Sequence, residues 1–177
     1  AAGVDMVLSA PMSLTADNRY IAEITAMCLA EAVSRLVQDG GLHVRVTHRS
    51  SFYPQERVSM MLSLREAPQD GFSSETFHKD PSEALTAVRN LLKNLESAEL
   101  TSSQLDACKK YLKQKIKQDQ QSPEYWLDAI AKRYLDGKDF STSYAAKIDA
   151  VNAEKVKKLL SELNAGSKVE YVVNPKQ

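Results

Sequence analysis

The first part of the chain begins with a strand pattern and changes to a helix pattern. The segment VDMVLSAPM is a short apolar run closed by Pro11, which predicts a strand of four to six residues. From Asn18 to Gln38 the apolar positions recur mostly at spacings of three and four residues, which predicts a long helix. Thr15 and Asp17 are candidate caps for its start, and Gly40-Gly41 marks its end.

The next segment has the period of a β-strand. Apolar residues alternate with polar ones from Leu42 to Val46, and again from Val58 to Leu64 after a polar turn that contains Pro54. Such alternation is typical of a strand with one buried face, and consecutive strands of this kind commonly pair antiparallel. We therefore predict two half-buried, antiparallel strands whose apolar faces pack against a layer of helices.

A polar loop and then helical patterns follow. Residues 66–79 are polar and rich in turn-forming residues, so they predict a connecting loop. Pro81 stands at an early helical position ahead of a leucine-rich stripe. Thr101 to Gln104 fits a capping box, which predicts the start of a second helix.

The last third of the chain predicts two more helices and a strand. Ser122 caps a helix that Gly137 ends. A fourth helix begins at Tyr144–Ile148, and Asn152 can cap its continuation. The apolar run VEYVV at 169–173 predicts a closing strand.

The order of these elements fits an α+β fold. A strand, a helix, two strands, a run of helices and a last strand do not alternate as in an α/β protein. We predict a mixed or antiparallel sheet of about four to five strands packed against a layer of helices. The 177 residues suit one domain, 1–177, whose first strand begins almost at the first residue.

Composition and charge narrow the classes of partner. The 23 basic and 23 acidic side chains cancel, so no overall positive field favours nucleic acid or an anionic membrane. No apolar run reaches the roughly 20 residues of a membrane span, and the first residues lack the pattern of a signal peptide. Cys28 and Cys108 each lie among helix-periodic apolar residues and are interpreted as buried free thiols.

Candidate chemical groups show no recognisable catalytic pattern. His43 and His48 are five residues apart on a strand, so they point to opposite faces, and with His78 they lack the spacing of zinc ligands. The glycines fit neither a phosphate loop nor a dinucleotide fingerprint. A basic helix face is interpreted as a solvated surface; its residues are Lys109, Lys110, Lys113, Lys115 and Lys117.

The aromatic side chains of one helix raise the question of a binding platform. Trp126, Ile130 and Tyr134 follow one another at spacings of four residues in the helix after Ser122. A stripe at helical spacing is more often core than a cofactor or ligand site. We therefore interpret this stripe as part of the core.

Several strings together resemble the insulinase/pitrilysin family of zinc peptidases, which includes mitochondrial processing peptidase. They cover nearly the whole chain in the family's order: VDMVLSAP, GGLHVRV after the long helix, VSMMLSLREAP, LTSSQLDACKKYLKQ, YWLDAIAKRYLDG, IDAVNAEKVKKLL and VEYVVNP. The likeness is to one of the repeated α+β domains of the processing-peptidase type, and most of all to a non-catalytic C-terminal one. It implies that residues 1–177 are the C-terminal part of a larger multi-domain peptidase.

The resemblance implies that catalysis takes place in another domain. Family members bind zinc through an H-x-x-E-H helix, and this motif is absent here, so no catalytic or metal residue is assigned. Zinc is expected in a catalytic sister domain, and the parent protein is expected to be a zinc-dependent metalloendopeptidase. Related non-catalytic domains hold the substrate with an arginine and a tyrosine, and Val37 and Val44 stand at those places.

The resemblance also implies the partners. These are other domains of the same peptidase or a homologous subunit, together with the peptide substrate, and no substrate-binding residue is assigned. An exposed sheet edge within 42–64 could bind an extended peptide by strand addition. One rival interpretation is a structural subunit, like the respiratory-complex core proteins that share the fold without proteolysis, and a second is an isolated interaction domain of another α+β family. The cell-envelope location of many bacterial relatives favours the periplasm.

Overall fold

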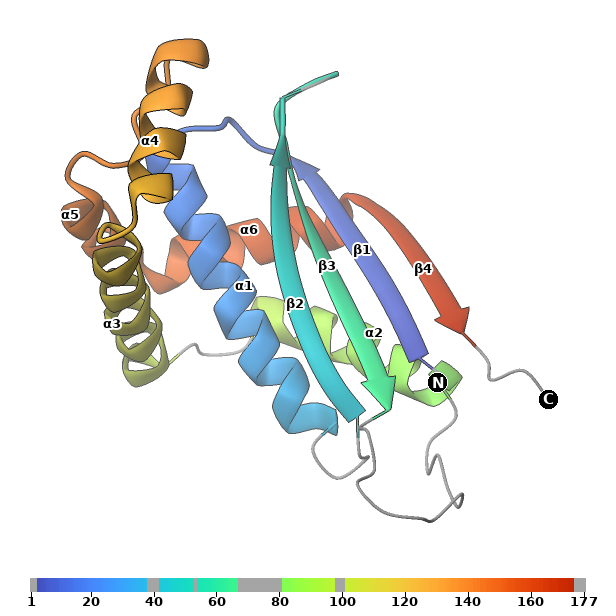
Figure 1. The fold of residues 1–177 in the computed structure, drawn as a ribbon. Helices are drawn as coiled ribbons and strands as arrows, with labels where there is room; N and C mark the ends of the chain where they lie inside the picture. The colour runs from blue at the N-terminus through green and yellow to red at the C-terminus, as the bar shows by residue number, and fades with distance from the viewer. Residues whose placement is uncertain (1–2, 38–41, 53, 67–80, 98–100, 174–177) are drawn as a thin grey trace, which may run out of the picture.

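One sheet and a layer of helices on one of its faces make up the structure (Figure 1). The computed structural model describes residues 3–37, 42–52, 54–66, 81–97 and 101–173. In chain order the elements are β1 (Gly3–Pro11), α1 (Ala16–Val37), β2 (Leu42–Ser51), β3 (Arg57–Glu66), α2 (Pro81–Ser97), α3 (Ser102–Asp119), α4 (Pro123–Leu135), α5 (Tyr144–Asp149), α6 (Ala153–Ala165) and β4 (Ser167–Val173). The predicted loop at 66–79 lies outside these ranges, apart from the end of β3.

The strands of the described part form an antiparallel sheet in the order β2-β3-β1-β4. The α+β class, the sheet of about four to five strands and the antiparallel pairing of the second and third strands are therefore confirmed. Helices α1, α2 and α6 lie against the sheet, while α3, α4 and α5 lie beyond α1 (Figure 1). Among the described residues, no helix is long and apolar enough to span a lipid bilayer.

β1 is longer than its sequence pattern predicted. It spans nine residues, and Pro11 still stands opposite Arg57 of β3. The predicted length of four to six residues was wrong because β1 pairs on both sides, with β3 and with β4. A proline that lacks an N–H is tolerated at the end of a strand, where a ladder bond can be missing.

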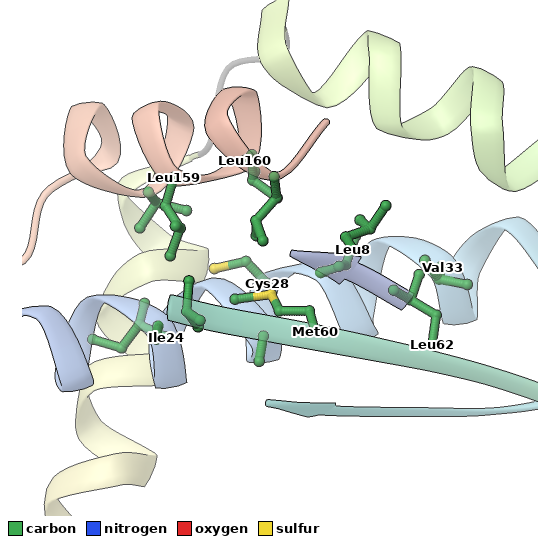
Figure 2. Packing of buried hydrophobic residues seen from close by; sticks show 14 of the residues in the cluster. Leu8, Ile24, Cys28, Val33, Met60, Leu62, Leu159 and Leu160 are labelled. Carbon is green, nitrogen blue, oxygen red and sulfur yellow. The ribbon is translucent and has the colours of Figure 1, made fainter. Parts of the chain in front are cut away.

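The core lies between the covered face of the sheet and α1, α2 and α6. Figure 2 shows Leu8 of β1 and Leu62 of β3 close to side chains of the helices. Successive residues of a strand point to opposite faces of the sheet, so every second residue of β1 and β3 points to this face. The labelled core residues are at most 6 % exposed, and they are Leu8, Ile24, Cys28, Val33, Met60, Leu62, Leu159 and Leu160.

Four helices begin at side-chain caps that the sequence predicted. The side-chain oxygens of Thr15, Thr101, Ser122 and Asn152 each accept a hydrogen bond from the backbone N–H three residues further on, at 2.9–3.4 Å. Each cap satisfies one backbone donor that the helix itself cannot. Asp17, the other candidate cap of the first long helix, lies inside the first turn of α1. The interruption predicted before Asn152 is confirmed, since α5 ends and α6 begins there.

β4 is an edge strand, and it contains the closing strand that was predicted at 169–173. It pairs only with β1 within the described sheet, and nearly all of its side chains are exposed. Glu170 is the one half-buried exception, because its carboxylate accepts two hydrogen bonds from the guanidinium of Arg89 on α2. This ion pair ties the edge of the sheet to the helical layer.

The two cysteines are buried free thiols, as predicted, and they meet between two helices. Cys28 of α1 and Cys108 of α3 have their Sγ atoms 4.0 Å apart. The hydrogen bond with Cys108 and burial both raise the pKa of the Cys28 thiol. Because the thiolate is the reactive form, this thiol is poorly reactive in the folded protein.

We expect both thiols to resist alkylation at pH 8 in the native protein and to react fully in denaturant. If reaction requires local opening that costs about 3 kcal/mol, labelling is slowed roughly 100-fold or more. Iodoacetamide labelling followed by intact-mass spectrometry measures this. Ser103→Cys, at an exposed position of α3, supplies a fast-reacting control in the same chain. Native labelling of Cys28 or Cys108 as fast as the control would contradict their burial.

Candidate functional site

β2 offers its outer edge as a candidate binding element. It stands at one end of the strand order and pairs only with β3 in the described sheet. Within the described segments, no backbone-to-backbone hydrogen bond other than the ladder to β3 reaches residues 42–51. An edge strand directs half of its N–H and C=O groups away from its neighbour, so an extended peptide can pair with it. The structure thus provides the edge that strand addition requires.

The side chains of β2 alternate between two different surroundings. Val44, Val46 and His48 are half-buried on the covered face, whereas His43 and its alternate neighbours are exposed on the open face. The prediction that His43 and His48 point to opposite faces is therefore confirmed. His78 lies outside the described residues.

His48 borders a cavity of about 410 Å³ between the end of β2, the start of α1 and α4. Its lining residues are Met12, Leu14, Thr15, Asn18, Arg19, Glu23, His48, Arg49, Ser50, Phe52, Lys132, Asp136 and Phe140. Burial lowers the pKa of His48, and the carboxylate of Glu23 opposes this shift. The neutral imidazole is therefore favoured, and its place is half-buried rather than fully exposed to solvent.

A second cavity of about 380 Å³ lies between α1, α3 and α4 and shares Arg19, Glu23, Lys132 and Phe140 with the first. We call the two together the α4 groove. Arg19 Nε lies 3.2 Å from Glu23 Oε1, and its guanidinium carbon lies 5.1 Å from the ring centre of Phe140. The Tyr20 hydroxyl donates to the Phe140 carbonyl at 2.5 Å, and burial raises the pKa of Tyr20 to about 12. Paired charges and an aromatic ring suit side-chain binding rather than nucleophilic chemistry.

The described residues do not fit a zinc site. No three of their histidine, cysteine, aspartate and glutamate side chains come together as metal ligands. The H-x-x-E-H motif is also absent from the whole sequence. The assignment of zinc to a sister domain remains a prediction.

The interpretation of the aromatic stripe on α4 as core was wrong. Trp126, Ile130 and Tyr134 are 44 %, 53 % and 82 % exposed, and Leu127 on the same side is 71 % exposed. α4 itself is formed as predicted, between the Ser122 cap and a glycine of positive φ at 137. Only the opposite side of the helix, including Tyr125, packs against the molecule. We call the four exposed residues the α4 face.

The basic face of α3 is a solvated surface, as predicted. Lys113 Nζ lies 2.7 Å from Asp149 Oδ1, and Lys115 Nζ lies 2.9 Å from Asp119 Oδ2. Lys109 donates to the backbone oxygen of Asp149 at 3.0 Å. Three of the five lysines are thus already paired with neighbouring groups.

Val37 and Val44, the two places that the resemblance equates with a substrate-holding pair, carry apolar side chains. Val44 is half-buried and packs against the core from β2. Val37 is the last residue of α1, and its side chain lies outside the described part. A valine at either place cannot donate a hydrogen bond to a peptide carbonyl.

No family model matches the sequence, and no curated protein is significantly similar to it. The fold, by contrast, matches solved structures. A mutant of the ferredoxin protease FusC in complex with Arabidopsis ferredoxin is 16 % identical, with a TM-score of 0.71, over 99 % of this chain and 19 % of that one. The chain thus spans about a fifth of FusC.

Two further structures are similar over almost all of this chain. The inactive peptidase domain of a candidate zinc protease from Bordetella parapertussis is 14 % identical, with a TM-score of 0.70, over 100 % of this chain and 93 % of that one. A predicted insulinase family protease from Yersinia pestis is 11 % identical, with a TM-score of 0.63, over 99 % of this chain and 40 % of that one. The chain therefore has the fold of an insulinase-like peptidase domain.

Proposed function

We propose that this chain is a non-catalytic domain of a zinc peptidase of the insulinase type, and that it helps to enclose and position a peptide for a catalytic sister domain. The single observation that carries the proposal is the unpaired outer edge of β2 on a fold shared with such peptidases. The missing H-x-x-E-H motif supports catalysis in a separate domain, because in such peptidases that motif supplies zinc ligands and the base toward a metal-bound water.

The α4 face supplies a surface for the sister domain. Four large apolar side chains on one side of a short helix are unusual on a free surface and are typical of an interface core. Because the chain spans only 19 % of FusC, a parent protein of that kind has other domains to cover such a face. We propose that a domain of the same peptidase or a homologous subunit packs on it.

The first test is hydrolysis. The purified 177-residue chain is expected to show no chelator-sensitive cleavage of unstructured peptides, because its sequence lacks the zinc motif. Fluorogenic peptide libraries with and without a chelator measure this. Cleavage that disappears with chelator and returns with zinc would refute the proposal.

The second test is peptide binding at the edge of β2. Titration with an extended peptide is expected to shift the backbone amide signals of residues 42–51 in NMR spectra, since those groups would gain hydrogen bonds. A peptide N-methylated at alternate positions cannot pair as a strand and serves as the control. No shifts at millimolar peptide would reject strand addition.

The alternative function is a structural subunit without a role in proteolysis. The observation that favours it is the α4 face, which would suit a permanent partner as well as a sister domain. The two functions differ at β2, because a structural subunit has no reason to bind free peptides there. The same NMR titration therefore separates them.

A further inference from the structure

The open face of the sheet carries a concentration of positive charge that the neutral composition hides. On β2 the exposed residues at alternate positions are His43, Arg45, Thr47 and Arg49. On β3 the same face holds Arg57 and Arg65, since these stand opposite Ser51 and His43. Among the described residues of this face the one acidic side chain is Asp5 of β1, opposite Ser63.

The arginines of β3 have polar partners, whereas among the described residues those of β2 have none. Arg65 forms an ion pair with Asp5 at 2.5 Å, and Arg57 donates to the hydroxyl of Ser9 at 3.1 Å. Within the described part of the chain, no ion pair or hydrogen bond holds the side chain of Arg45 or of Arg49. Two guanidinium groups are therefore available on the strand whose backbone edge is unpaired.

The geometry of a sheet brings these two features together. A strand added beside β2 would place every second side chain on the open face, next to a residue of β2 at about 5 Å between Cβ atoms. Arg45 and Arg49 are four residues apart, which corresponds to roughly 13 Å along a strand. Acidic residues four positions apart in the added strand would thus lie beside both arginines.

We propose that His43, Arg45 and Arg49, which we call the arginine edge, select extended peptides that carry acidic residues at alternate positions and bind as a strand beside β2. This inference rests on the proposed strand addition and adds the class of peptide. Opposite charges on neighbouring strands attract across the pair, and a basic peptide would meet like charges.

Peptide is favoured over nucleic acid for two reasons. The outward side chains of β2 include no phenylalanine, tyrosine or tryptophan ring on which a base could stack. The rest of the molecule adds no net positive charge that would follow a phosphate backbone, because its acidic and basic residues balance. An oligonucleotide is therefore a competitor to be excluded by experiment.

The experiment compares three peptides that differ only in charge. Eight-residue peptides alternate valine with glutamate, glutamine or lysine, and each is titrated into the 177-residue chain while the amide signals of residues 42–51 are followed. The glutamate peptide is expected to bind about fivefold more tightly than the glutamine peptide at low salt, since two exposed charge pairs contribute modestly. The lysine peptide is expected to bind most weakly, and 0.5 M salt is expected to abolish the differences.

A pair of charge reversals assigns the preference to the arginine edge. The double variant Arg45→Glu, Arg49→Glu should prefer the lysine peptide, and circular dichroism should show an unchanged fold because both side chains are exposed. The matched control Lys110→Glu, Lys117→Glu reverses two exposed charges on α3 and should keep the original preference. A control that loses the preference would show that overall charge, not the arginine edge, is responsible.

The remaining outcomes separate this inference from the function on which it rests. Equal binding of all three peptides with shifts in β2 would overturn the acidic preference and leave strand addition intact. No shifts with any peptide would overturn both. If the N-methylated glutamate peptide bound as tightly as the unmethylated one, the peptide would be attracted by charge without pairing as a strand, and the inference would be overturned. If a single-stranded oligonucleotide bound these residues more tightly than the glutamate peptide, the surface would be assigned to nucleic acid and the inference would be overturned.

Discussion

Replacement of Gly166 by alanine is expected to destabilise the fold by about 3 kcal/mol, because the added methyl group has no space. Gly166 joins α6 to β4, and a Cβ built there would lie 2.1 Å from the backbone oxygen of Ser9. That oxygen belongs to β1, which is held between β3 and β4, so neither partner can move without disturbing the ladder. The melting temperature should fall by roughly 6–12 °C for a domain of this size.

The same substitution at Gly137 provides the matched control. Gly137 has a φ of +65° but no atom within 4 Å of an added Cβ, so alanine there is disfavoured only by its backbone conformation. Its expected cost is about 1 kcal/mol. Thermal and urea unfolding followed by circular dichroism compare the two variants. If Gly166→Ala were no less stable than Gly137→Ala, the close approach of β1 to the α6–β4 junction would be wrong.

Features that depend on neighbours in the sequence were predictable. The caps at Thr101, Ser122 and Asn152 need only an acceptor placed three residues before a free N–H, and all three form. The alternation in β2 and β3 likewise fixes which side chains face the core, because a strand places successive residues on opposite faces. These local rules were enough to derive the antiparallel pair and the α+β class.

Features that depend on what lies opposite were not predictable from local pattern. The stripe of Trp126, Ile130 and Tyr134 marks an apolar side of α4, but the pattern does not say whether this side is buried within the same chain. The meeting of Cys28 with Cys108 depends on the packing of α1 against α3. In these cases the sequence specifies a side-chain face, and only the tertiary arrangement specifies its neighbour.

The candidate site also combines a feature that the sequence predicts with one that only the tertiary structure shows. The alternate positions of Arg45 and Arg49 in LHVRVTHRS were visible in the sequence as one outward face. Their freedom from acidic partners was not, because it depends on Ser63 and Ser59 standing opposite them on β3. A balanced composition therefore concealed a local excess of positive charge.

Leucine-to-alanine changes at Leu8 and Leu127 are expected to differ by several kcal/mol in their effect on stability. Leu8 is fully buried between the sheet and the helices, so Leu8→Ala removes packed methyl groups and leaves a cavity, at a cost of about 2–5 kcal/mol. Leu127 is 71 % exposed on α4, and Leu127→Ala should change the stability by no more than about 0.5 kcal/mol. Urea unfolding of both variants and of the unmodified chain measures the difference.

This comparison also tests the role given to the α4 face. Leu127→Ala keeps a good helix former in α4, so any loss of stability would have to come from lost packing. A loss of 2 kcal/mol or more would mean that α4 packs on its own chain after all. If instead stability is unchanged while the variant loses affinity for a sister domain, the apolar side chains of α4 serve the interface, because the same atoms would matter only when that partner is present.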